Sequence, residues 1–268
     1  MSKWLILGAG RCGLQLALAL TRKTAVFAGV VCRSNSSFAR ASAVLPKEQV
    51  LSWSQEFPQN TNLLIAVQDR ELDAVVQALR QRKGVHPAIL HTSGSRGLQP
   101  LAPLKETGAA FGIFHPLVPF PHPSRPRVRL QGATVTLTGD PEAVAAARIL
   151  AQRLGMRPVI CSSLDWPLYH AAANLAGPLL YALLLTARQE LARAGFPQED
   201  VATALQVLAR AVLHQVSQAR AWELLTGPMA RGDTSTVQAH LVVLESKARR
   251  AYEALTGLVP PQKDLWSE

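Results

Sequence analysis

Cysteine, aromatic residues and acidic residues are all scarce in this sequence. Its 268 residues include three cysteines, 6% aromatic residues, and 18 acidic residues against 28 basic ones. Cys12, Cys32 and Cys161 are too few and too far apart for a disulfide framework, and their number is odd. We therefore predict buried, reduced thiols and a cytoplasmic protein.

Long apolar runs and metal-binding motifs are missing as well. No stretch of about 18 apolar residues is free of charges and helix breakers, so no membrane span is predicted. The apolar run after Lys3 superficially resembles a signal peptide, but Arg11 interrupts it. The seven histidines are dispersed and neither CxxC nor HExxH occurs, so no metal site is predicted.

The excess of basic residues gives a net charge of +10 and a pI of about 10.2. Such a balance favours anionic partners, from a phosphorylated cofactor to a nucleic acid. The basic residues are scattered, however, and the densest cluster, at 247–250, lies on a predicted helix. No aromatic residues alternate with a basic stripe. The sequence therefore favours a solvated basic surface and predicts no nucleic-acid partner.

A glycine-rich turn stands between a strand and a helix at the start of the chain. Trp4 to Leu7 is apolar, GAGRCG follows, and Leu14 to Leu20 continues as an apolar helix. In a dinucleotide-binding turn, the first glycine makes the tight turn, the second admits the pyrophosphate, and the third lets helix and strand pack closely. Glycines also mark ordinary turns, but here both flanking elements are present. The candidate cofactor-binding residues are Gly8, Ala9, Gly10, Arg11, Cys12 and Gly13.

The second predicted strand ends on a basic residue instead of an acidic one. An NAD site carries Asp or Glu about 20 residues past the glycines, where it binds the ribose 2′-hydroxyl. Arg33 stands at that offset, and Ser34 follows it. Arginine with hydroxyl neighbours suits a 2′-phosphate, which a carboxylate would repel. The sequence therefore favours NADP over NAD, and the alternative is a solvated loop arginine.

Strands and helices alternate over residues 1–161. The predicted strands after the first are 24–32, 62–67, 86–91, 109–114, 133–138 and 158–161. Helical spacing over 69–79 and a capped helix at 141–154 lie between them. This alternation predicts an α/β fold with a doubly wound sheet, a Rossmann domain. Val67 is a further candidate for contact with the cofactor, and Ser93 is one for the cofactor or the substrate.

Residues 162–268 read as helix only and form the predicted all-α second domain. One helix starts at Asp165, runs towards Gly195 and should kink at Pro178. A second covers 197–221, and a last helix covers 234–255.

His115 is the strongest candidate for a catalytic residue. It follows a strand that is predicted to end at Phe114, and it opens a segment with five prolines, 115–126, predicted to be a rigid extended loop. Ligands of open α/β sheets bind outside the carboxyl ends of the strands, and histidine suits acid–base work near neutral pH. The alternative is a histidine that bonds a backbone carbonyl.

Two polar residues share one face of the helix that follows the sheet. His170 and Asn174 are four residues apart. A histidine exchanges a proton and an amide holds a substrate oxygen, so both are candidate catalytic residues. The alternative is contact with a neighbouring helix or a second subunit.

The loop before the last predicted helix combines glycines, exposed N–H groups and an arginine. This makes it a candidate pocket for a substrate carboxylate. The candidate substrate-binding residues there are Arg231, Asp233 and Thr234. The alternative is a capped turn, with Asp233 or Thr234 as the N-cap.

These motifs together resemble a family of bacterial Rossmann-like proteins with a C-terminal helical domain of unknown function. The segments GAGRCG, HTSGS, FHPLVPF, YHAAAN and TGPMARGD…VQAHL recur in that order over nearly the whole chain. The layout is similar to that of pyrroline-5-carboxylate reductase, prephenate dehydrogenase and the β-hydroxyacid dehydrogenases. The resemblance implies an NADP-binding domain, a helical domain like that of 6-phosphogluconate dehydrogenase that dimerises, and an active site between the two.

The same resemblance implies roles for single residues. His115-Pro116-Leu117 matches the His-Pro-hydrophobic segment that carries the catalytic histidine of prephenate dehydrogenases. The β-hydroxyacid dehydrogenases use Lys-x-x-x-Asn, where this chain has His170 and Asn174, so the catalytic lysine is absent. The loop at 226–236 is comparable in placement to the carboxylate-binding loop of pyrroline-5-carboxylate reductases.

The sequence thus predicts an NADP-dependent oxidoreductase that moves hydride to or from a small carboxylate-bearing keto, hydroxy, imino or amino substrate, and that forms a homodimer. The alternative is an NADP-binding sensor or regulatory protein without hydride transfer, which the absent lysine favours.

Overall fold

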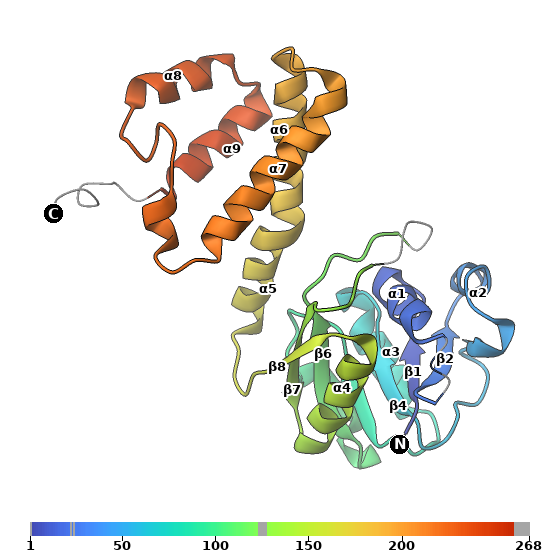
Figure 1. The fold of residues 1–268 in the computed structure, drawn as a ribbon. Coiled ribbons are helices and arrows are strands. Elements are labelled where there is room, and N and C mark those ends of the chain that lie inside the picture. Colours follow the sequence, from blue (N-terminus) through green and yellow to red (C-terminus); the bar gives the residue numbers. More distant parts are fainter. Residues whose placement is uncertain (1, 22, 24, 123–127, 260–268) are drawn as a thin grey trace. The chain divides into compact units, whose positions relative to one another are not determined.

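The chain folds into two compact units that divide between Gly177 and Pro178. The structure is a computed structural model that describes residues 2–21, 23, 25–122 and 128–259 (Figure 1). Residues 123–126 of the predicted proline-rich loop therefore lie outside the described residues.

The first unit is built on an eight-stranded sheet with the order β3-β2-β1-β4-β5-β6-β7-β8. Its strands are β1 (Trp4–Leu7), β2 (Phe27–Cys32), β3 (Val50–Ser52), β4 (Asn62–Ile65), β5 (Ala88–His91), β6 (Ala110–Pro116), β7 (Thr134–Gly139) and β8 (Arg157–Ile160). All neighbouring strands are parallel except β6 and β7. The order 3-2-1-4-5-6 is that of dinucleotide-binding sheets, which confirms the predicted Rossmann domain.

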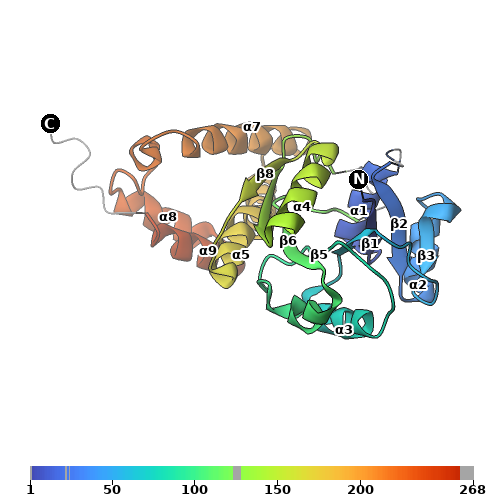
Figure 2. The ribbon, with the colours of Figure 1, turned by 90° about the horizontal axis from the view of Figure 1, so that it is seen from below.

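Helices cover both faces of this sheet, as Figure 2 shows. They are α1 (Arg11–Leu20), α2 (Asn35–Ser42), α3 (Asp69–Arg80), α4 (Pro141–Leu154), and the 3₁₀ segments Lys47–Gln49 and Gln99–Thr107. Side chains alternate along β1, so Trp4 and Ile6 pack in the core with α1, α2 and α4. Leu5 and Leu7 pack on the other face with α3 and the segment Gln99–Thr107. Burial on both faces is the reason why the parallel strands read as continuous apolar runs.

Helix α5 (Trp166–Asn174) also belongs to the first unit. The sequence assigned it to a second domain beginning at residue 162. Its first turns instead pack on the sheet, because Tyr169 hydrogen-bonds to strands β6 and β7.

The second unit consists of helices only. They are α6 (Leu180–Arg193), α7 (Gln198–Val216), the 3₁₀ segment Ala221–Leu224, α8 (Thr234–Val243) and α9 (Ser246–Thr256). A π-helical turn, Leu175–Leu179, joins α5 to α6 and contains Pro178, so the regular α-helix is interrupted at this proline. By length and composition alone, Trp166–Arg193 would suffice to cross a membrane, with a mean hydropathy of 1.3.

The prediction of one continuous last helix over 234–255 is wrong. The chain is extended at Leu244 (ψ 138°) and Glu245 (ψ 156°), and α9 starts anew at Ser246. The Glu245 carboxylate lies 3.2 Å from Arg193 Nε of α6. Neither glycine nor proline marks the break in the sequence. The ion pair between Glu245 and Arg193 of α6 accompanies it instead.

Candidate functional site

The three glycines of the turn after β1 do not serve the same purpose. Gly8 has a φ of +119°, and a Cβ there would lie 2.6 Å from the Ala66 carbonyl oxygen. A Cβ on Gly13 would lie 2.1 Å from the Gly8 carbonyl oxygen. At Gly10 the nearest atom is 3.9 Å away. The packing of the protein therefore requires glycine at positions 8 and 13, whereas the space beside Gly10 is open.

That open space belongs to a cavity of about 850 Å³ above the carboxyl ends of β1, β2 and β4. The predicted cofactor-binding residues that line it are Gly8, Ala9, Gly10, Arg11, Cys12, Arg33, Ser34 and Val67. This edge, where the strand order reverses between β1 and β4, is the position at which open α/β sheets bind their ligands. The turn and the end of β2 thus meet at one cavity, as the sequence predicts.

The side of the cavity after β2 carries positive charge and hydroxyl groups. Ser34 caps α2, where its side chain accepts a hydrogen bond from Ser37 N–H at 3.2 Å. Arg40, on the same helix, donates from Nε to the Ala9 carbonyl at 3.1 Å and so ties α2 to the glycine turn. Arg33 faces the Trp53 ring at 6.0 Å and lies 3.9 Å from the Glu71 carboxylate. Two guanidinium groups and the N-terminus of α2 therefore face the same space.

Cys12 connects the glycine turn to the end of β5. Burial raises the pKa of its thiol to about 12 in spite of a hydrogen bond with Thr92. All three cysteines are free; Cys32 is buried, Cys12 is half-buried with its thiol on the buried side, and Cys161 is half-buried, in contrast to the prediction. Ser93, the next residue after Thr92, is buried, and its hydroxyl accepts from Ser95 N–H at 3.3 Å.

His91 at the end of β5 is a structural residue. Its Nδ1 accepts a hydrogen bond from Ser93 N–H at 3.1 Å, so Nε2 must carry the proton that it donates to the Gly97 carbonyl at 2.8 Å. Burial lowers its pKa from 6.5 to about 4. His91 is therefore neutral and fixes the loop that follows β5.

His115 lies at the centre of a second group of side chains. Contrary to the prediction, strand β6 continues through it to Pro116, and it pairs with Thr136 of β7. His115 Nδ1 lies 2.8 Å from Tyr169 Oη, which lies 2.8 Å from Thr136 Oγ1. The backbone of Gly94 leaves room for the ring, because a Cβ there would lie 2.5 Å from His115 Nε2.

The ring of His170 packs edge-on against that of His115, with the ring centres 5.8 Å apart. The pKa of His115 falls from 6.5 to about 4, chiefly because of burial and secondly because of His170. The structure thus brings these two predicted catalytic residues together, with His115 neutral at physiological pH. Asn174 lies one turn along α5, where its amide donates to the His170 carbonyl at 2.8 Å.

The cavity and the His115 cluster lie along the same sheet edge. The turn follows β1, and His115 is the second-last residue of β6, which is three strand spacings away, about 14 Å at 4.8 Å per spacing. Thr92 and Ser93 after β5 lie between them. An extended dinucleotide with its phosphates at the turn would reach across this distance.

The predicted carboxylate-binding residues belong to the helical unit. Asp233 is the N-cap of α8, where it accepts from Thr236 N–H at 3.0 Å and from the hydroxyls of Ser235 and Thr236. These bonds lower the pKa of its carboxyl to about 2. The capping alternative therefore accounts for Asp233, while substrate binding by Arg231 and Thr234 stays a prediction.

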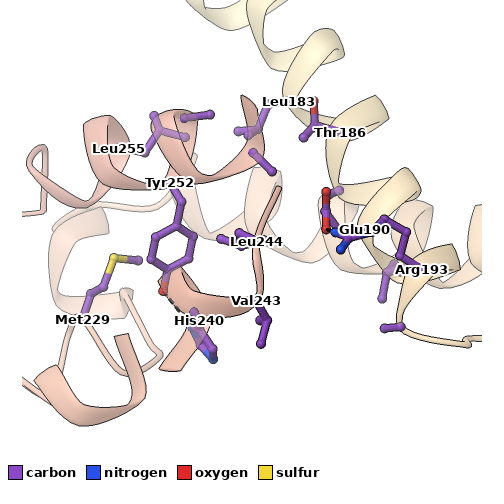
Figure 3. A pocket seen from close by; sticks show the side chains of 15 residues that line it. Leu183, Thr186, Glu190, Arg193, Met229, His240, Val243, Leu244, Tyr252 and Leu255 are labelled. Carbon is purple, nitrogen blue, oxygen red and sulfur yellow. Dashed lines mark hydrogen bonds and ion pairs between the residues drawn. The ribbon is translucent and has the colours of Figure 1, made fainter. Parts of the chain in front are cut away.

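The helical unit has a cavity of its own, of about 770 Å³, between α6 and the pair α8 and α9 (Figure 3). Its walls are mostly aliphatic, with Leu183 on α6, Leu255 on α9 and Leu244 in the extended break between α8 and α9. Polar groups lie at its margin: Glu190 and Arg193 come from α6, and His240 bonds to Tyr252 Oη at 2.9 Å. Within the described ranges, no group of three or more His, Cys, Asp or Glu residues could hold a metal ion.

Sequence reasoning missed four residues beside these sites: Arg40, Trp53, Thr136 and Tyr169. Tyr169 precedes His170 in the segment YHAAAN, so its position could have marked it. Thr136 and Trp53 carry no such signal, because only the order of the strands brings them to the site.

Comparison with known families places the two halves of the chain. Residues 3–116 match a family described as a Rossmann-like domain, and residues 133–258 match a domain of unknown function, DUF2520. This chain is a Rossmann-like domain followed by a DUF2520 domain. The resemblance predicted from the sequence motifs is thereby confirmed. No curated protein sequence matches the chain.

Solved structures of similar fold extend over both units. A Bacteroides fragilis protein assigned provisionally as an NADP oxidoreductase is 20% identical, with a TM-score of 0.77 over 96% of this chain and 97% of its own. An imine reductase from Myxococcus stipitatus in complex with NADP+ is 14% identical, with a TM-score of 0.64 over 96% and 92%. A pyrroline-5-carboxylate reductase from Coxiella burnetii is 15% identical, with a TM-score of 0.59 over 96% and 98%. At these identities the similarity shows the fold.

Proposed function

We propose that this Rossmann–DUF2520 protein is an NADP-dependent oxidoreductase acting on a small carboxylate-bearing substrate with a keto, hydroxy, imino or amino group. The observation that carries the proposal is Gly10. Its missing Cβ faces a cavity and no protein atom within 3.9 Å, so packing does not explain the glycine. A pyrophosphate lying against the turn does explain it.

The choice of NADP rests on the charges around the same cavity. Arg33 and Arg40 and the hydroxyl groups at the start of α2 suit a 2′-phosphate. Glu71 is the carboxylate in the lining, and Arg33 lies beside it. The proteins of similar fold that are described as an NADP oxidoreductase and as an imine reductase with NADP+ support the same choice.

The reaction site would be the cluster at the end of β6. A bound nicotinamide would supply or accept the hydride. His115 would bind the reacting oxygen or nitrogen of the substrate, and His170 and Asn174 would orient it. The pyrroline-5-carboxylate reductase and imine reductase of similar fold support a C=N bond as the reacting group.

Titration with NADPH and NADH, followed by nicotinamide fluorescence, tests the cofactor. We expect NADPH to bind more tightly than NADH, and Arg33→Ala to reduce this preference about tenfold, or about 1.4 kcal/mol. Arg220→Ala, which removes the same charge from an exposed position in the helical unit, is the control. Binding of neither nucleotide by the native protein would refute the proposal.

Turnover separates an oxidoreductase from a sensor. Keto acids and cyclic imino acids are screened for oxidation of bound NADPH, and hydroxy and amino acids for reduction of NADP+. His115→Ala and His170→Ala should then lose turnover while NADPH still binds. Full activity of both variants would exclude these residues, and NADPH binding without turnover of any substrate would favour the regulatory alternative.

We also propose that the protein is a homodimer joined through its helical unit. Among the described apolar residues of this unit, only Val201, Ala230, Leu241 and Ala248 are buried. On α7, Leu208, Val212 and Val216 follow one another at helical spacing and are 64%, 48% and 65% exposed. A stripe of this kind is typical of a surface that another subunit covers.

Sedimentation in detergent-free buffer tests this pairing. We expect a dimer, and Leu208→Glu with Val212→Glu should yield monomers. Arg210→Glu, on the opposite side of α7, is the charged control and should stay dimeric. A native monomer would contradict the proposal. Uptake of the native protein by phosphatidylcholine vesicles would instead point to a membrane as the cover of this surface.

A further inference from the structure

The hydrogen bonds around His115 form a short chain with one end closed. His115 and Thr136 are paired in register on β6 and β7, so their side chains lie on the same face of the sheet. Tyr169 from α5 bridges them, with 2.8 Å from its Oη to His115 Nδ1 and 2.8 Å to Thr136 Oγ1. Thr136 is 2% exposed, so this end of the chain is closed to solvent.

The closed end decides the direction of the hydrogen bonds. In the part of the chain that the structure describes, Tyr169 Oη is the one hydrogen-bond partner of the Thr136 hydroxyl. If Tyr169 donated to Thr136, the buried threonine hydrogen would have no acceptor, which is unfavourable. Thr136 therefore donates to Tyr169, and Tyr169 donates to His115 Nδ1. A neutral imidazole that accepts at Nδ1 carries its proton on Nε2.

The Nε2 atom of His115 is open to a ligand. Among the described residues, this nitrogen has no hydrogen-bond partner. It is not fully buried either, because Gln15 Nε2 is the only fully buried side-chain nitrogen or oxygen of these residues that lacks a partner. Solvent therefore reaches His115 Nε2 beside the Gly94 backbone. The outer nitrogen of the ring is a free N–H donor.

We propose that Thr136 and Tyr169 are positioning residues that hold His115 as its neutral Nε2–H tautomer, so that it donates a hydrogen bond to the oxygen or nitrogen of a substrate C=O or C=N group. The substrate class rests on the proposed function, whereas the tautomer does not. A donor at this point polarises the double bond towards hydride addition. It makes His115 a hydrogen-bond donor in the resting protein instead of a base.

The surrounding charges are consistent with a neutral ring. The groups that face His115 are His170 and Tyr169 on α5, His91 on β5 and Asp69 on α3. His170 and His91 lower the pKa of His115, and Asp69 opposes them with a smaller effect than burial.

Long-range ¹H–¹⁵N NMR of the histidine side chains at pH 7 reads the tautomer directly. The signals of His115 are assigned by their loss in His115→Gln. His91 is the internal reference for an Nε2–H tautomer, because a backbone N–H occupies its Nδ1. We expect the native His115 to match it. Tyr169→Phe, which removes the donor to Nδ1, should shift the tautomer ratio at least tenfold towards Nδ1–H. Thr136→Val leaves Tyr169 able to donate and should shift the ratio less.

Tyr252→Phe is the matched control, because it removes a tyrosine that bonds His240 Nδ1 in the helical unit and should leave His115 unchanged. An Nδ1–H tautomer in the native protein, or an unchanged ratio in a folded Tyr169→Phe variant, would overturn the proposal. If the native protein shows the Nε2–H tautomer but binds no NADPH, the proposed function fails while the tautomer assignment stands.

Discussion

Replacing the second and third glycines of the turn by alanine should separate ligand binding from stability. Gly10 has φ −78° and ψ −173°, which alanine adopts without strain, and its added Cβ would meet no protein atom closer than 3.9 Å. Alanine is a poorer N-cap than glycine, but it restricts the unfolded chain, and the two effects oppose each other. We therefore expect Gly10→Ala to change the free energy of unfolding by less than about 1 kcal/mol.

The same methyl group at position 13 meets the backbone. Its Cβ would lie 2.1 Å from the Gly8 carbonyl oxygen, and neither β1 nor α1 yields without losing packing in the core. We expect Gly13→Ala to lower the free energy of unfolding by roughly 1–3 kcal/mol or more, as overpacked cores do.

Among the variants that remain folded, NADPH affinity should fall more in Gly10→Ala than in Gly13→Ala, which is the reverse of the order expected for stability. The Gly10→Ala methyl group occupies the space proposed for the pyrophosphate, so NADPH affinity should fall about thirtyfold, or about 2 kcal/mol. Urea unfolding measures the stability, and nicotinamide fluorescence measures the dissociation constant. Native-like NADPH affinity in Gly10→Ala, or native stability in Gly13→Ala, would refute the reasoning from the turn geometry.

Three further predictions concern the His115 cluster and the cap of α8. Because the folded pKa values of His91 and His115 are about 4 and the ordinary value is 6.5, the unfolded chain binds more protons between these pH values. The free energy of unfolding should therefore be retained above pH 6.5 and fall towards pH 4, and the buried His91 should account for about 3 kcal/mol of the loss. Urea unfolding at several pH values measures this dependence, and a flat profile would contradict the lowered pKa values. Gly94→Ala should displace the His115 ring, since its Cβ would lie 2.5 Å from Nε2, and a His115 NMR spectrum like that of the native protein would disprove the contact. Asp233→Ala should lower the Tm by removing the cap of α8, while NADPH affinity stays unchanged; an unchanged Tm would show that the cap is dispensable.

The parts of the fold that are encoded locally were predictable from the sequence. The apolar runs of β1, β4 and β5 are continuous because both faces of the sheet are covered, and the glycine turn follows β1 directly. The helix Pro141–Leu154, with Gly155 at its end, was predicted to the residue, because proline and glycine mark its two ends. Where the break had no such marker, at Leu244 and Glu245, the prediction failed.

Candidate site residues were predictable where their position along the chain coincides with a strand end. Arg33, Ser93 and His115 are of this kind, since the carboxyl ends of parallel strands share one edge of the sheet. Arg40 was missed because a helix turn brings it back to Ala9. Trp53 was missed because β3 lies beside β2 at the edge of the sheet.

The sequence by itself determined the Rossmann domain and the helical second half, because propensity and periodicity act over a few residues. Only the tertiary structure decided how His115 is used. The antiparallel pairing of β6 with β7 sets Thr136 opposite His115, and α5 brings Tyr169 between them. The protonation state of His115 depends on these three elements together, which lie far apart along the chain.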